Sequence, residues 1–357
     1  MSAPYLRPAV AAMHAYVPGE QPEGDRVLKL NTNENPYPPS PKVFDALGSL
    51  SADDLRRYPQ PTARKLRAAI AALHQVDPAQ VFVGNGSDEV LALMTRAFAP
   101  AGGRVGFLSP SYSLYPVLAE IAELQTVTWP LAEDFTWAVP ASLDVDLFFL
   151  TQPNAPTSLA LPLAEVRNAA RACRGVFVVD EAYADFAEET AVALLAEFPN
   201  VMISRSFSKS YSLAGLRVGY ALGPAPLIAA LDTIKDSYNL DVLAQRMALA
   251  AVEDQAWMLQ NVTAVRGTRA AVAQALTRRG FAVLPSQTNF VFARVSEGQS
   301  AAAIYAALRD RQVFVRYFPG PATGDWLRIT IGTDAQMDRF LAELDALLSA
   351  GVSGENF

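Results

Sequence analysis

Residues 206–217 read Ser206-Phe207-Ser208-Lys209-Ser210-Tyr211-Ser212-Leu213-Ala214-Gly215-Leu216-Arg217, and this stretch indicates both the fold and the chemistry. It follows a short apolar run, Val201 to Ser204, of the kind that forms a β-strand. Its lysine, hydroxyl groups and arginine suit a ligand that carries an aldehyde and a phosphate. Pyridoxal 5'-phosphate (PLP) has both groups and attaches to lysine as a Schiff base. A Ser-x-x-Lys segment by itself is usually a polar loop. The interpretation as a PLP site therefore depends on the rest of the chain.

The composition indicates a folded chain with room for one large and one smaller domain. The sequence has 357 residues, of which 51% are hydrophobic, so it can bury a sizeable core and disorder is not expected. Its net charge of −7 argues against non-specific nucleic-acid binding, which requires a basic surface. The two histidines, His14 and His74, and the absence of a Cys/His cluster at zinc spacing argue against a metal site.

The chain also lacks the sequence signals of export and membrane insertion. Met1 to Val10 has no apolar core of a signal peptide. No apolar run approaches the ~20 residues that cross a bilayer. The only cysteine, Cys173, allows no intrachain disulfide and fits a reducing compartment. We therefore expect a cytoplasmic protein that binds neither membranes nor nucleic acid.

From about residue 60 to residue 225, short apolar runs alternate with helix-length amphipathic segments. This alternation predicts an α/β fold with a mainly parallel sheet. The predicted strands are Val81–Val83, Val105–Leu108, Leu147–Thr151, Val176–Val179, Val201–Ser204 and Val218–Leu222, and the predicted helices between them include Asp88–Phe98, Leu114–Glu123 and Leu163–Cys173.

The pattern changes after about residue 240 and predicts a smaller α+β domain. A long helix over Gln255–Arg278 stops before Gly280, a suitable C' glycine. The last helix starts at a capping box, Thr333 to Gln336, and runs to about Ser349. Between them we expect strand Phe290–Val295, helix Ala301–Arg311, and strands Val313–Tyr317 and Leu327–Ile331. The expected division is 1–40 as a segment packing on the small domain or a partner subunit, 41–240 as a large PLP-binding domain, and 241–357 as a small C-terminal domain.

Polar groups follow the predicted strands, at the edge where open α/β sheets bind ligands. The turn Gly84-Asn85-Gly86-Ser87-Asp88-Glu89 feeds a helix N-terminus, which is either a phosphate cradle or an ordinary N-cap. Tyr112 could stack on a planar ring or pack as an ordinary aromatic residue. Asp180 ends a buried apolar run and needs a cationic partner, such as a protonated pyridine nitrogen, unless it only caps a helix. Tyr183 could reach the phenolic oxygen of the same ring.

Two arginines, Arg316 and Arg328, lie on or beside the C-terminal strands. Arginine binds carboxylate and phosphate through a two-pronged fork, although a structural salt bridge is the alternative. The order of cradle, aromatic residue, proline-containing loop, Asp-x-x-Tyr and Ser-x-x-Lys-x7-Arg is that of fold-type I PLP enzymes. This order, rather than any one site, supports the interpretation that the chain binds PLP.

Across nearly its whole length the chain resembles the histidinol-phosphate aminotransferases of the class I/II aminotransferases. The matching stretches are Leu30–Tyr37, Arg57-Tyr58-Pro59, Gly86–Glu89, Val179–Tyr183, Ser208-Lys209, Ala214–Arg217 and Leu327–Thr333. The resemblance implies a fold-type I enzyme, PLP as cofactor and a homodimer.

The resemblance also implies roles for individual residues. Lys209 would form the Schiff base and move the substrate proton, Asp180 would pair with the pyridinium and Tyr183 would donate to the phenolic oxygen. Tyr58 would reach the cofactor phosphate of the neighbouring subunit. The remaining implied contacts are Tyr112 as the stacking ring; Gly86, Ser87, Asp88, Ser206, Ser208 and Arg217 at the phosphate; Arg328 at a substrate anion; Arg316 and Tyr16 near a substrate phosphate; and Asn33 in the loop that covers the site.

Two positions depart from the family pattern. In Pro153-Asn154-Ala155-Pro156-Thr157-Ser158, Ala155 stands where the family has the asparagine that bonds the cofactor's phenolic oxygen. We hypothesise that Asn154 makes this bond, the alternative being that Tyr183 makes it alone. Asp241 stands where the family has a small neutral residue. It would repel a phosphate if it faced the pocket, and a solvated loop position is the alternative.

The expected activity is amino transfer from histidinol phosphate to 2-oxoglutarate by a ping-pong mechanism through Lys209. The small-molecule partners would be an amino donor and a 2-oxo acid. Alternatives are an aromatic amino acid aminotransferase, a PLP-dependent decarboxylase of a phosphorylated amino acid, and a non-catalytic PLP-binding regulator. The regulator is disfavoured because no DNA-binding segment is visible. The sequence leaves open the exact donor, the direction of Asp241 and the movement of the N-terminal segment.

Overall fold

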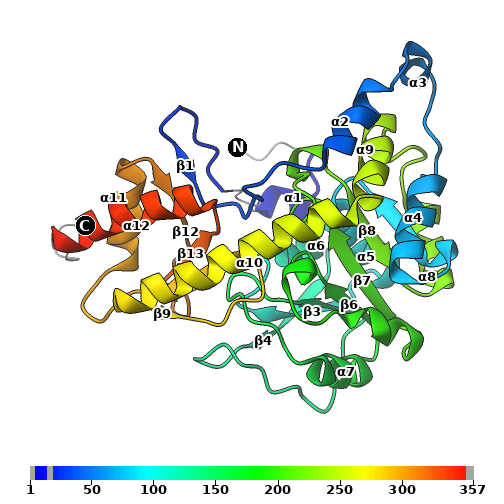
Figure 1. Cartoon of the computed structure of the whole chain (residues 1–357). Helices are drawn as coiled ribbons and strands as arrows, with labels where there is room; N and C mark the ends of the chain where they lie inside the picture. The colour runs from blue at the N-terminus through cyan, green and yellow to red at the C-terminus, as the bar shows by residue number, and fades with distance from the viewer. Residues whose placement is uncertain (1–4, 14–18, 351–357) are drawn as a thin grey trace.

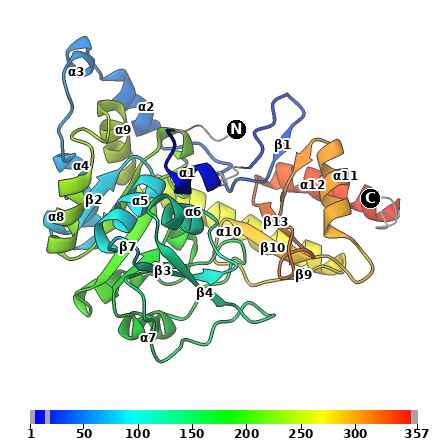
Figure 2. The same ribbon diagram turned by 180° about the vertical axis from the view of Figure 1, so that it is seen from behind.

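The computed structural model describes residues 5–13 and 19–350. A large part is built around one sheet, and a smaller C-terminal part lies beside it (Figure 1). The long helix α10 (Gln255–Arg278) extends from the smaller part to the helices of the larger one. Seen from behind, α5 (Ser87–Phe98) and α6 (Leu114–Ile121) lie over the large sheet (Figure 2).

The large sheet has seven strands in the order β2-β8-β7-β6-β5-β3-β4. Only β8 runs antiparallel to its neighbours, so the prediction of a mainly parallel α/β sheet is confirmed. The central strands are buried on both faces, because helices cover the sheet from both sides. The bounds are β2 Val81–Gly84, β3 Arg104–Ser109, β4 Gln125–Pro130, β5 Leu147–Thr151, β6 Val176–Asp180, β7 Val201–Ser206 and β8 Gly219–Leu222.

Strand β4 is absent from the sequence prediction, for a clear physical reason. It lies at the sheet edge, parallel to β3, and most of its side chains are exposed or half-buried. An edge strand does not need the continuous apolar run that marks strands buried on both faces. A search for such runs therefore cannot find it.

The helices of the large part bury opposite faces of the sheet. Side chains of α5, α6 and α8 pack with one set of strand residues, and those of α4 and α7 pack with the set that points the other way. This follows from the alternation of side chains along a strand. Helix α9 packs against α2 and α4. The remaining bounds are α1 Pro8–Ala12, α2 Pro41–Gly48, α3 Ala52–Arg56, α4 Arg64–His74, α7 Leu163–Ala172, α8 Ala225–Ile234 and α9 Val242–Val252.

The smaller part holds a four-stranded antiparallel sheet in the order β12-β13-β10-β9. The predicted strand Val313–Tyr317 is split into β11 and β12, because the chain changes partner at Val315. Strand β11 pairs with the N-terminal β1, whereas β12 pairs with β13. The bounds are β1 Leu28–Lys29, β9 Ala282–Val283, β10 Phe290–Arg294, β11 Val313–Phe314, β12 Arg316–Tyr317, β13 Trp326–Thr330, α11 Ala301–Asp310 and α12 Asp334–Ser349.

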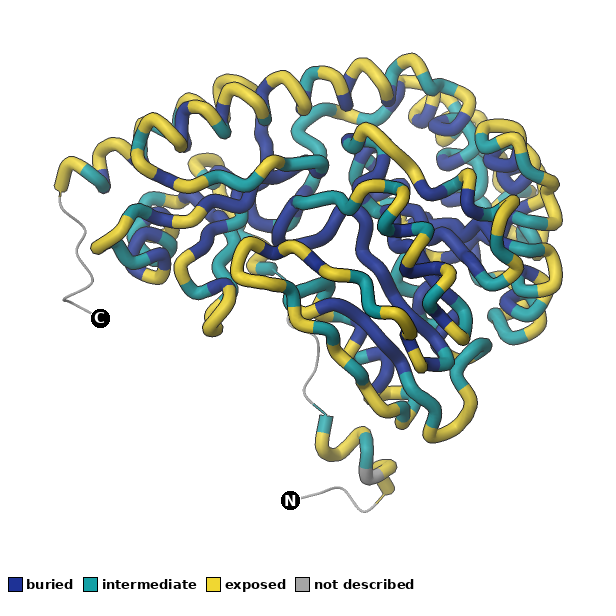
Figure 3. Tube along the Cα trace, turned by 90° about the horizontal axis from the view of Figure 1, so that it is seen from below, coloured by how far each residue is buried: buried dark blue, intermediate teal, exposed yellow. Residues whose placement is uncertain are grey.

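The tube coloured by burial shows this layering: the inner strands are buried, and the outward faces of the helices are exposed (Figure 3). Among the residues that the structure describes, no helix is both long enough and apolar enough to span a bilayer.

The predicted ends of two C-terminal helices are confirmed by their hydrogen bonds. After α10, Gly280 has a φ of 87°, and the amides of Gly280 and Phe281 donate to the carbonyls of Thr277 and Leu276. At the start of α12, the side chains and amides of Thr333 and Gln336 bond reciprocally, as a capping box requires. Both signals are local, so the sequence alone reveals them.

Two glycine-to-alanine substitutions in the same helix region are expected to change stability in opposite directions. Gly280→Ala should lower the free energy of unfolding by about 1–2 kcal/mol, because its positive φ disfavours a side chain. Gly267→Ala, inside α10 with open space around the added carbon, should raise it by about 0.5–1 kcal/mol. Urea unfolding of both variants measures the difference. Equal effects of the two substitutions would contradict this account.

Candidate active site

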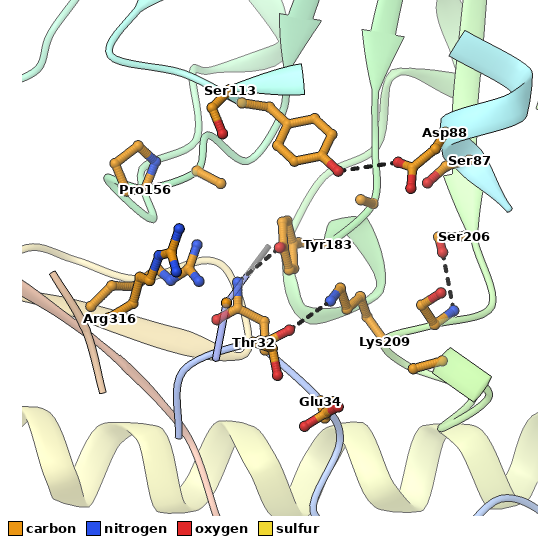
Figure 4. Close-up of a pocket in the computed structure, with 18 of the residues that line it drawn as sticks. Thr32, Glu34, Ser87, Asp88, Ser113, Pro156, Tyr183, Ser206, Lys209 and Arg316 are labelled. Atoms are coloured by element: carbon orange, nitrogen blue, oxygen red, sulfur yellow. Dashed lines mark hydrogen bonds between the residues drawn. The ribbon is translucent and has the colours of Figure 1, made fainter. Parts of the chain in front are cut away.

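A cavity of about 400 Å³ opens where the ends of the large sheet's strands meet the N-terminal segment and the smaller sheet. Side chains from all three regions point toward it (Figure 4). The cavity brings together most of the residues singled out in the sequence: Asn33, Ser87, Asp88, Tyr112, Asp180, Tyr183, Ser206, Ser208, Lys209, Arg217, Arg316 and Arg328. Parallel strands that end at one edge explain why residues so distant in sequence converge.

One side of the cavity is suited to a phosphate dianion. Helix α5 begins there after Gly86, whose φ is 86°, and no side chain of the described residues caps it. Its first amides are therefore available to an anion, with the positive end of the helix dipole behind them. The Arg217 guanidinium lies alongside, 3.2 Å from Asp88 Oδ2 and 3.5 Å from Ser208 Oγ.

The glycine at position 86 is needed for this arrangement. A β-carbon added to Gly86 would lie 2.7 Å from Nη2 of Arg217. Ser208 in turn donates its amide to Ser206 Oγ at 3.1 Å, which orders the hydroxyl-bearing turn after β7. The start of α5, the hydroxyls of Ser206 and Ser208 and the Arg217 guanidinium thus line the same cavity.

The carboxylate of Asp180 lies at the end of β6 and is almost fully buried. Its Oδ2 accepts a hydrogen bond from the Tyr115 hydroxyl at 2.9 Å, whereas Oδ1 has no hydrogen-bond partner among the described residues. Burial raises the pKa of Asp180 to about 7. A protonated pyridine nitrogen would supply the missing donor and the missing positive charge, so the site fits PLP.

The Lys209 amine is prepared to act as a nucleophile. It is half-buried, its Nζ donates to the Thr32 carbonyl at 3.1 Å, and Nζ lies 5.8 Å from the centre of the Tyr183 ring. Burial, followed by the positive charge of Arg328, lowers the pKa of Lys209 to about 8. A substantial neutral fraction therefore exists near neutral pH, and the neutral amine is the form that attacks an aldehyde.

Asn33 joins the smaller sheet to Tyr183. Its Nδ2 donates to the Tyr183 hydroxyl at 2.9 Å, and its Oδ1 accepts from Thr330 Oγ1 at 3.0 Å. The backbone N–H of Asn33 also donates to Thr330 Oγ1, and its backbone conformation is left-handed, with a φ of 56°. Asparagine tolerates this conformation better than most residues. Asn33 is therefore buried in the site, between Tyr183 and the strand that carries Arg328.

Arg316 and Arg328 face each other across the pair β12–β13. The Phe318 ring lies 5.5 Å from the Arg316 guanidinium and 5.2 Å from that of Arg328. Arg328 also donates to the Asn31 carbonyl at 2.7 Å. Like charges directly opposite each other are unfavourable, so an anion in the cavity would stabilise the pair.

The structure does not place Asn154 where the sequence hypothesis requires it. Asn154 does not line the cavity. Both hydrogens of its Nδ2 have acceptors, the Pro110 carbonyl at 3.1 Å and Thr157 Oγ1 at 3.0 Å, and its Oδ1 accepts from Ser111. An amide with both hydrogens engaged has none for a cofactor oxygen, so the hypothesis is corrected: Asn154 is a scaffold residue.

Two other residues from the sequence analysis, Asp241 and Tyr58, do not line the cavity. Asp241 is exposed and caps α9 by accepting from the Ala244 amide at 2.7 Å, which is the solvated alternative. Tyr58 is 81% exposed on the loop before α4, where its ring stacks on Tyr238 at 4.5 Å. Tyr16 lies outside the described residues.

Sequence reasoning missed Tyr115 and Thr151, which bond to each other at 2.6 Å beneath Asp180. Thr151 also lines the cavity. Tyr115 lies one helical turn after Tyr112, and Thr151 ends a predicted strand. Both positions could therefore have been predicted to lie near the cavity. Their contact with Asp180 depends on the sheet order, which the sequence does not show.

Comparison with known proteins agrees with this site. The family model "Aminotransferase class I and II" matches residues 25–344. The chain is 44% identical over 344 residues to the histidinol-phosphate aminotransferase of Citrifermentans bemidjiense, covering 96% of this chain and 98% of that one. It is 46% identical over 354 residues to histidinol-phosphate aminotransferase 1 of Burkholderia pseudomallei, covering 97% and 99%.

A solved structure has the same fold. The histidinol-phosphate aminotransferase of Sinorhizobium meliloti in complex with pyridoxal-5'-phosphate superimposes with a TM-score of 0.86 at 25% identity, covering 98% of each chain. The fold and the lysine–aspartate cavity define a PLP-dependent enzyme of fold type I. The chain belongs to the class I and II aminotransferases.

The rate at which cofactor-free protein attaches PLP should rise with pH through a midpoint of about 8, because only the neutral Lys209 amine reacts. Arg328→Gln should move this midpoint upward, since it removes a cation that disfavours the protonated amine. Visible absorbance after mixing with PLP measures the rate. Arg316→Gln, at the facing strand position, is the matched control. Equal midpoints in wild type and Arg328→Gln would contradict the assignment.

Proposed function

We propose that this aminotransferase transfers the amino group of histidinol phosphate to 2-oxoglutarate. The observation that carries the proposal is the facing pair Arg316 and Arg328, both of which line the cavity. Arg316 lies across the cavity from Ser87 and Asp88 (Figure 4). One cationic site holds the cofactor phosphate, and the second is available to an anionic substrate. The names of the relatives in Citrifermentans bemidjiense and Burkholderia pseudomallei support histidinol phosphate as the donor.

When bound, PLP supplies an aldehyde that captures the donor amine and a protonated ring that withdraws electrons from the substrate's α-carbon. The chain's residues supply the rest. Lys209 Nζ would take the proton from the substrate's α-carbon and deliver it to the carbon that carries the cofactor's aldehyde group. Asp180 Oδ1 would accept a hydrogen bond from the ring N–H and favour its protonated form. Tyr183, held by Asn33, donates to the ring oxygen.

A ping-pong enzyme must accept two different substrates in one cavity. Histidinol phosphate carries a phosphate, and 2-oxoglutarate carries two carboxylates, so the shared chemistry is an anion at the arginine pair. Asp241 does not line the cavity and caps a helix, so it gives no electrostatic reason to exclude a phosphate. This favours histidinol phosphate over the aromatic alternative.

Two alternatives have some support. Aromatic side chains in the cavity, Tyr112, Tyr183 and Phe318, would also suit an aromatic amino acid. A structure of L-threonine-O-3-phosphate decarboxylase from Porphyromonas gingivalis superimposes with a TM-score of 0.77 at 25% identity, covering 90% of this chain and 99% of that one. The same scaffold therefore also carries decarboxylation of a phosphorylated amino acid.

Single-turnover titration of the PLP-loaded enzyme distinguishes these functions. L-histidinol phosphate and L-glutamate should bleach the visible cofactor band, and L-phenylalanine should have little effect. Arg316→Gln and Arg328→Gln should each slow the reaction with histidinol phosphate by about 10–100-fold, because each removes a charge-assisted hydrogen bond. Fast bleaching by phenylalanine alone would identify an aromatic aminotransferase, and release of CO₂ from a phosphorylated amino acid would identify a decarboxylase.

We further propose that the active enzyme is a cytoplasmic homodimer in which Tyr58 enters the partner's site. Tyr58 is exposed on a loop, and Phe44, Leu47 and Leu55 on the neighbouring helices α2 and α3 are also exposed. Apolar side chains grouped on one edge favour a protein interface. A tyrosine hydroxyl projecting from that edge would add a donor to the phosphate site of the second subunit.

Hybrid dimers test this arrangement. Lys209→Ala and Tyr58→Ala chains should each be weakly active alone, and mixing under reassorting conditions should restore activity to roughly a quarter of wild type. Half of the dimers would then be hybrids, each with one site that has both side chains. Mixed chains that recover no activity, although sedimentation shows reassortment, would contradict the shared site.

A further inference from the structure

A chain of hydrogen bonds, buried except at the half-buried Ser111, connects the loop that contains Ala155 to the carboxylate of Asp180. It begins at Asn154 Oδ1, which accepts from Ser111 Oγ at 3.1 Å. Ser111 Oγ lies 3.0 Å from Thr151 Oγ1, which lies 2.6 Å from the Tyr115 hydroxyl. Tyr115 then bonds Asp180 Oδ2 at 2.9 Å. Asn154 and Thr151 are buried, and the Tyr115 side chain has no exposed surface.

The first group of the chain is fixed in orientation. The Asn154 nitrogen faces the Pro110 carbonyl, which can only accept, so the amide cannot be flipped. Its second hydrogen is directed to Thr157 Oγ1. The Asn154 oxygen is therefore held toward Ser111 as a pure acceptor, and it is the anchored end of the chain.

The number of hydrogens makes the chain sensitive to the charge of Asp180. Three hydroxyls, from Ser111, Thr151 and Tyr115, supply three hydrogens to four contacts. With Asp180 protonated, a fourth hydrogen is present and every contact can be made. With Asp180 ionised, Tyr115 must donate to it, and one contact nearer Asn154 loses its hydrogen. The direction of the chain therefore follows the proton on Asp180.

We propose that Asn154, Ser111, Thr151 and Tyr115 form a positioning relay that holds Oδ2 of Asp180, so that Oδ1 faces a cationic N–H of the cofactor ring. This inference rests on the proposed role of Asp180 toward PLP. It gives Asn154 a role that does not require contact with the cofactor. It also makes Tyr115 the residue through which the loop acts on the carboxylate.

The arrangement around Asp180 supports a positioning role. Its other oxygen lacks a partner among the described residues, so rotation of the carboxylate is opposed only by Tyr115 and the adjoining backbone. The titratable groups that act on Asp180 are Tyr115 from α6, Asp88 from α5 and its neighbour Glu181. Both carboxylates disfavour its ionised form, and Tyr115 alone among these side chains favours it. Removing the Tyr115 hydroxyl should therefore disfavour the ionised form.

The first test is PLP binding by the full chain. Tyr115→Phe keeps the ring and removes only the hydroxyl, and it should weaken PLP binding about tenfold, the loss expected for one charge-assisted hydrogen bond. Tyr220→Phe is the matched control, because that buried hydroxyl bonds His74 at 2.9 Å rather than Asp180. Thr151→Val should weaken binding in the same direction, and Thr151→Ser should restore it. Asn154→Ala should instead strengthen binding, because without that acceptor the three hydroxyl hydrogens satisfy every remaining contact to the ionised Asp180.

The second test uses the pH dependence of unfolding of the cofactor-free chain. A carboxyl whose folded pKa is raised stabilises the fold at low pH, and this contribution is lost as pH rises through the folded value, about 7 here. In Tyr115→Phe, the loss of stability with rising pH should continue to higher pH than in wild type, because the substitution raises the folded pKa of Asp180 further. In an Asp180→Asn background, Tyr115→Phe should have no pH-dependent effect. A purely structural role would lower stability equally at every pH.

The outcomes separate the relay from the proposed function. Wild-type PLP binding by Tyr115→Phe and Thr151→Val, with no pH-dependent difference in unfolding, would overturn the relay while leaving Asp180 in place. Wild-type or weaker PLP binding by Asn154→Ala would overturn the assignment of Asn154 as its anchor. Wild-type PLP binding and turnover by Asp180→Asn would instead overturn the proposed role of Asp180 itself.

Discussion

A carboxylate buried at the end of β6 is the constraint on which the rest of the site depends. Asp180 has almost no exposure to solvent, one oxygen bonded to Tyr115 and one oxygen with no partner among the described residues. Such a group is costly unless a cation arrives beside it. The parallel strands place Lys209, the N-terminus of α5 and Arg217 around the same cavity. The cofactor site is thus a consequence of where buried parallel strands end.

The smaller sheet completes the site from the opposite side. Arg316 and Arg328 face each other across β12–β13, and Asn33 bonds both Thr330 and Tyr183. The two sides of the cavity are therefore joined by direct hydrogen bonds through Asn33. Arg328, on the smaller sheet, lowers the pKa of Lys209. The position of the smaller sheet therefore affects how readily the Lys209 amine loses its proton.

Most of the fold and the site was predictable from local signals. The buried strands were found because strands covered on both faces are continuous apolar runs, and the ends of α10 and α12 because glycine and capping-box rules act within a few residues. The edge strand β4 was missed, because an exposed edge needs no apolar run. The partner change at Val315 was missed for another reason: it depends on β1, nearly three hundred residues earlier.

The sequence by itself determined which groups are present and in what order: a lysine with hydroxyls and an arginine, an aspartate after an apolar run, and two arginines on C-terminal strands. Those patterns are local, and their chemistry is a property of the residue types. Only the tertiary structure decided the role of Asn154, because its amide is engaged by Pro110 and Thr157 rather than by the cavity. It likewise decided that Asp241 caps a helix and that Tyr115 supports Asp180. Hydrogen-bond partners far apart in sequence are set by how strands and helices pack, which no local pattern records.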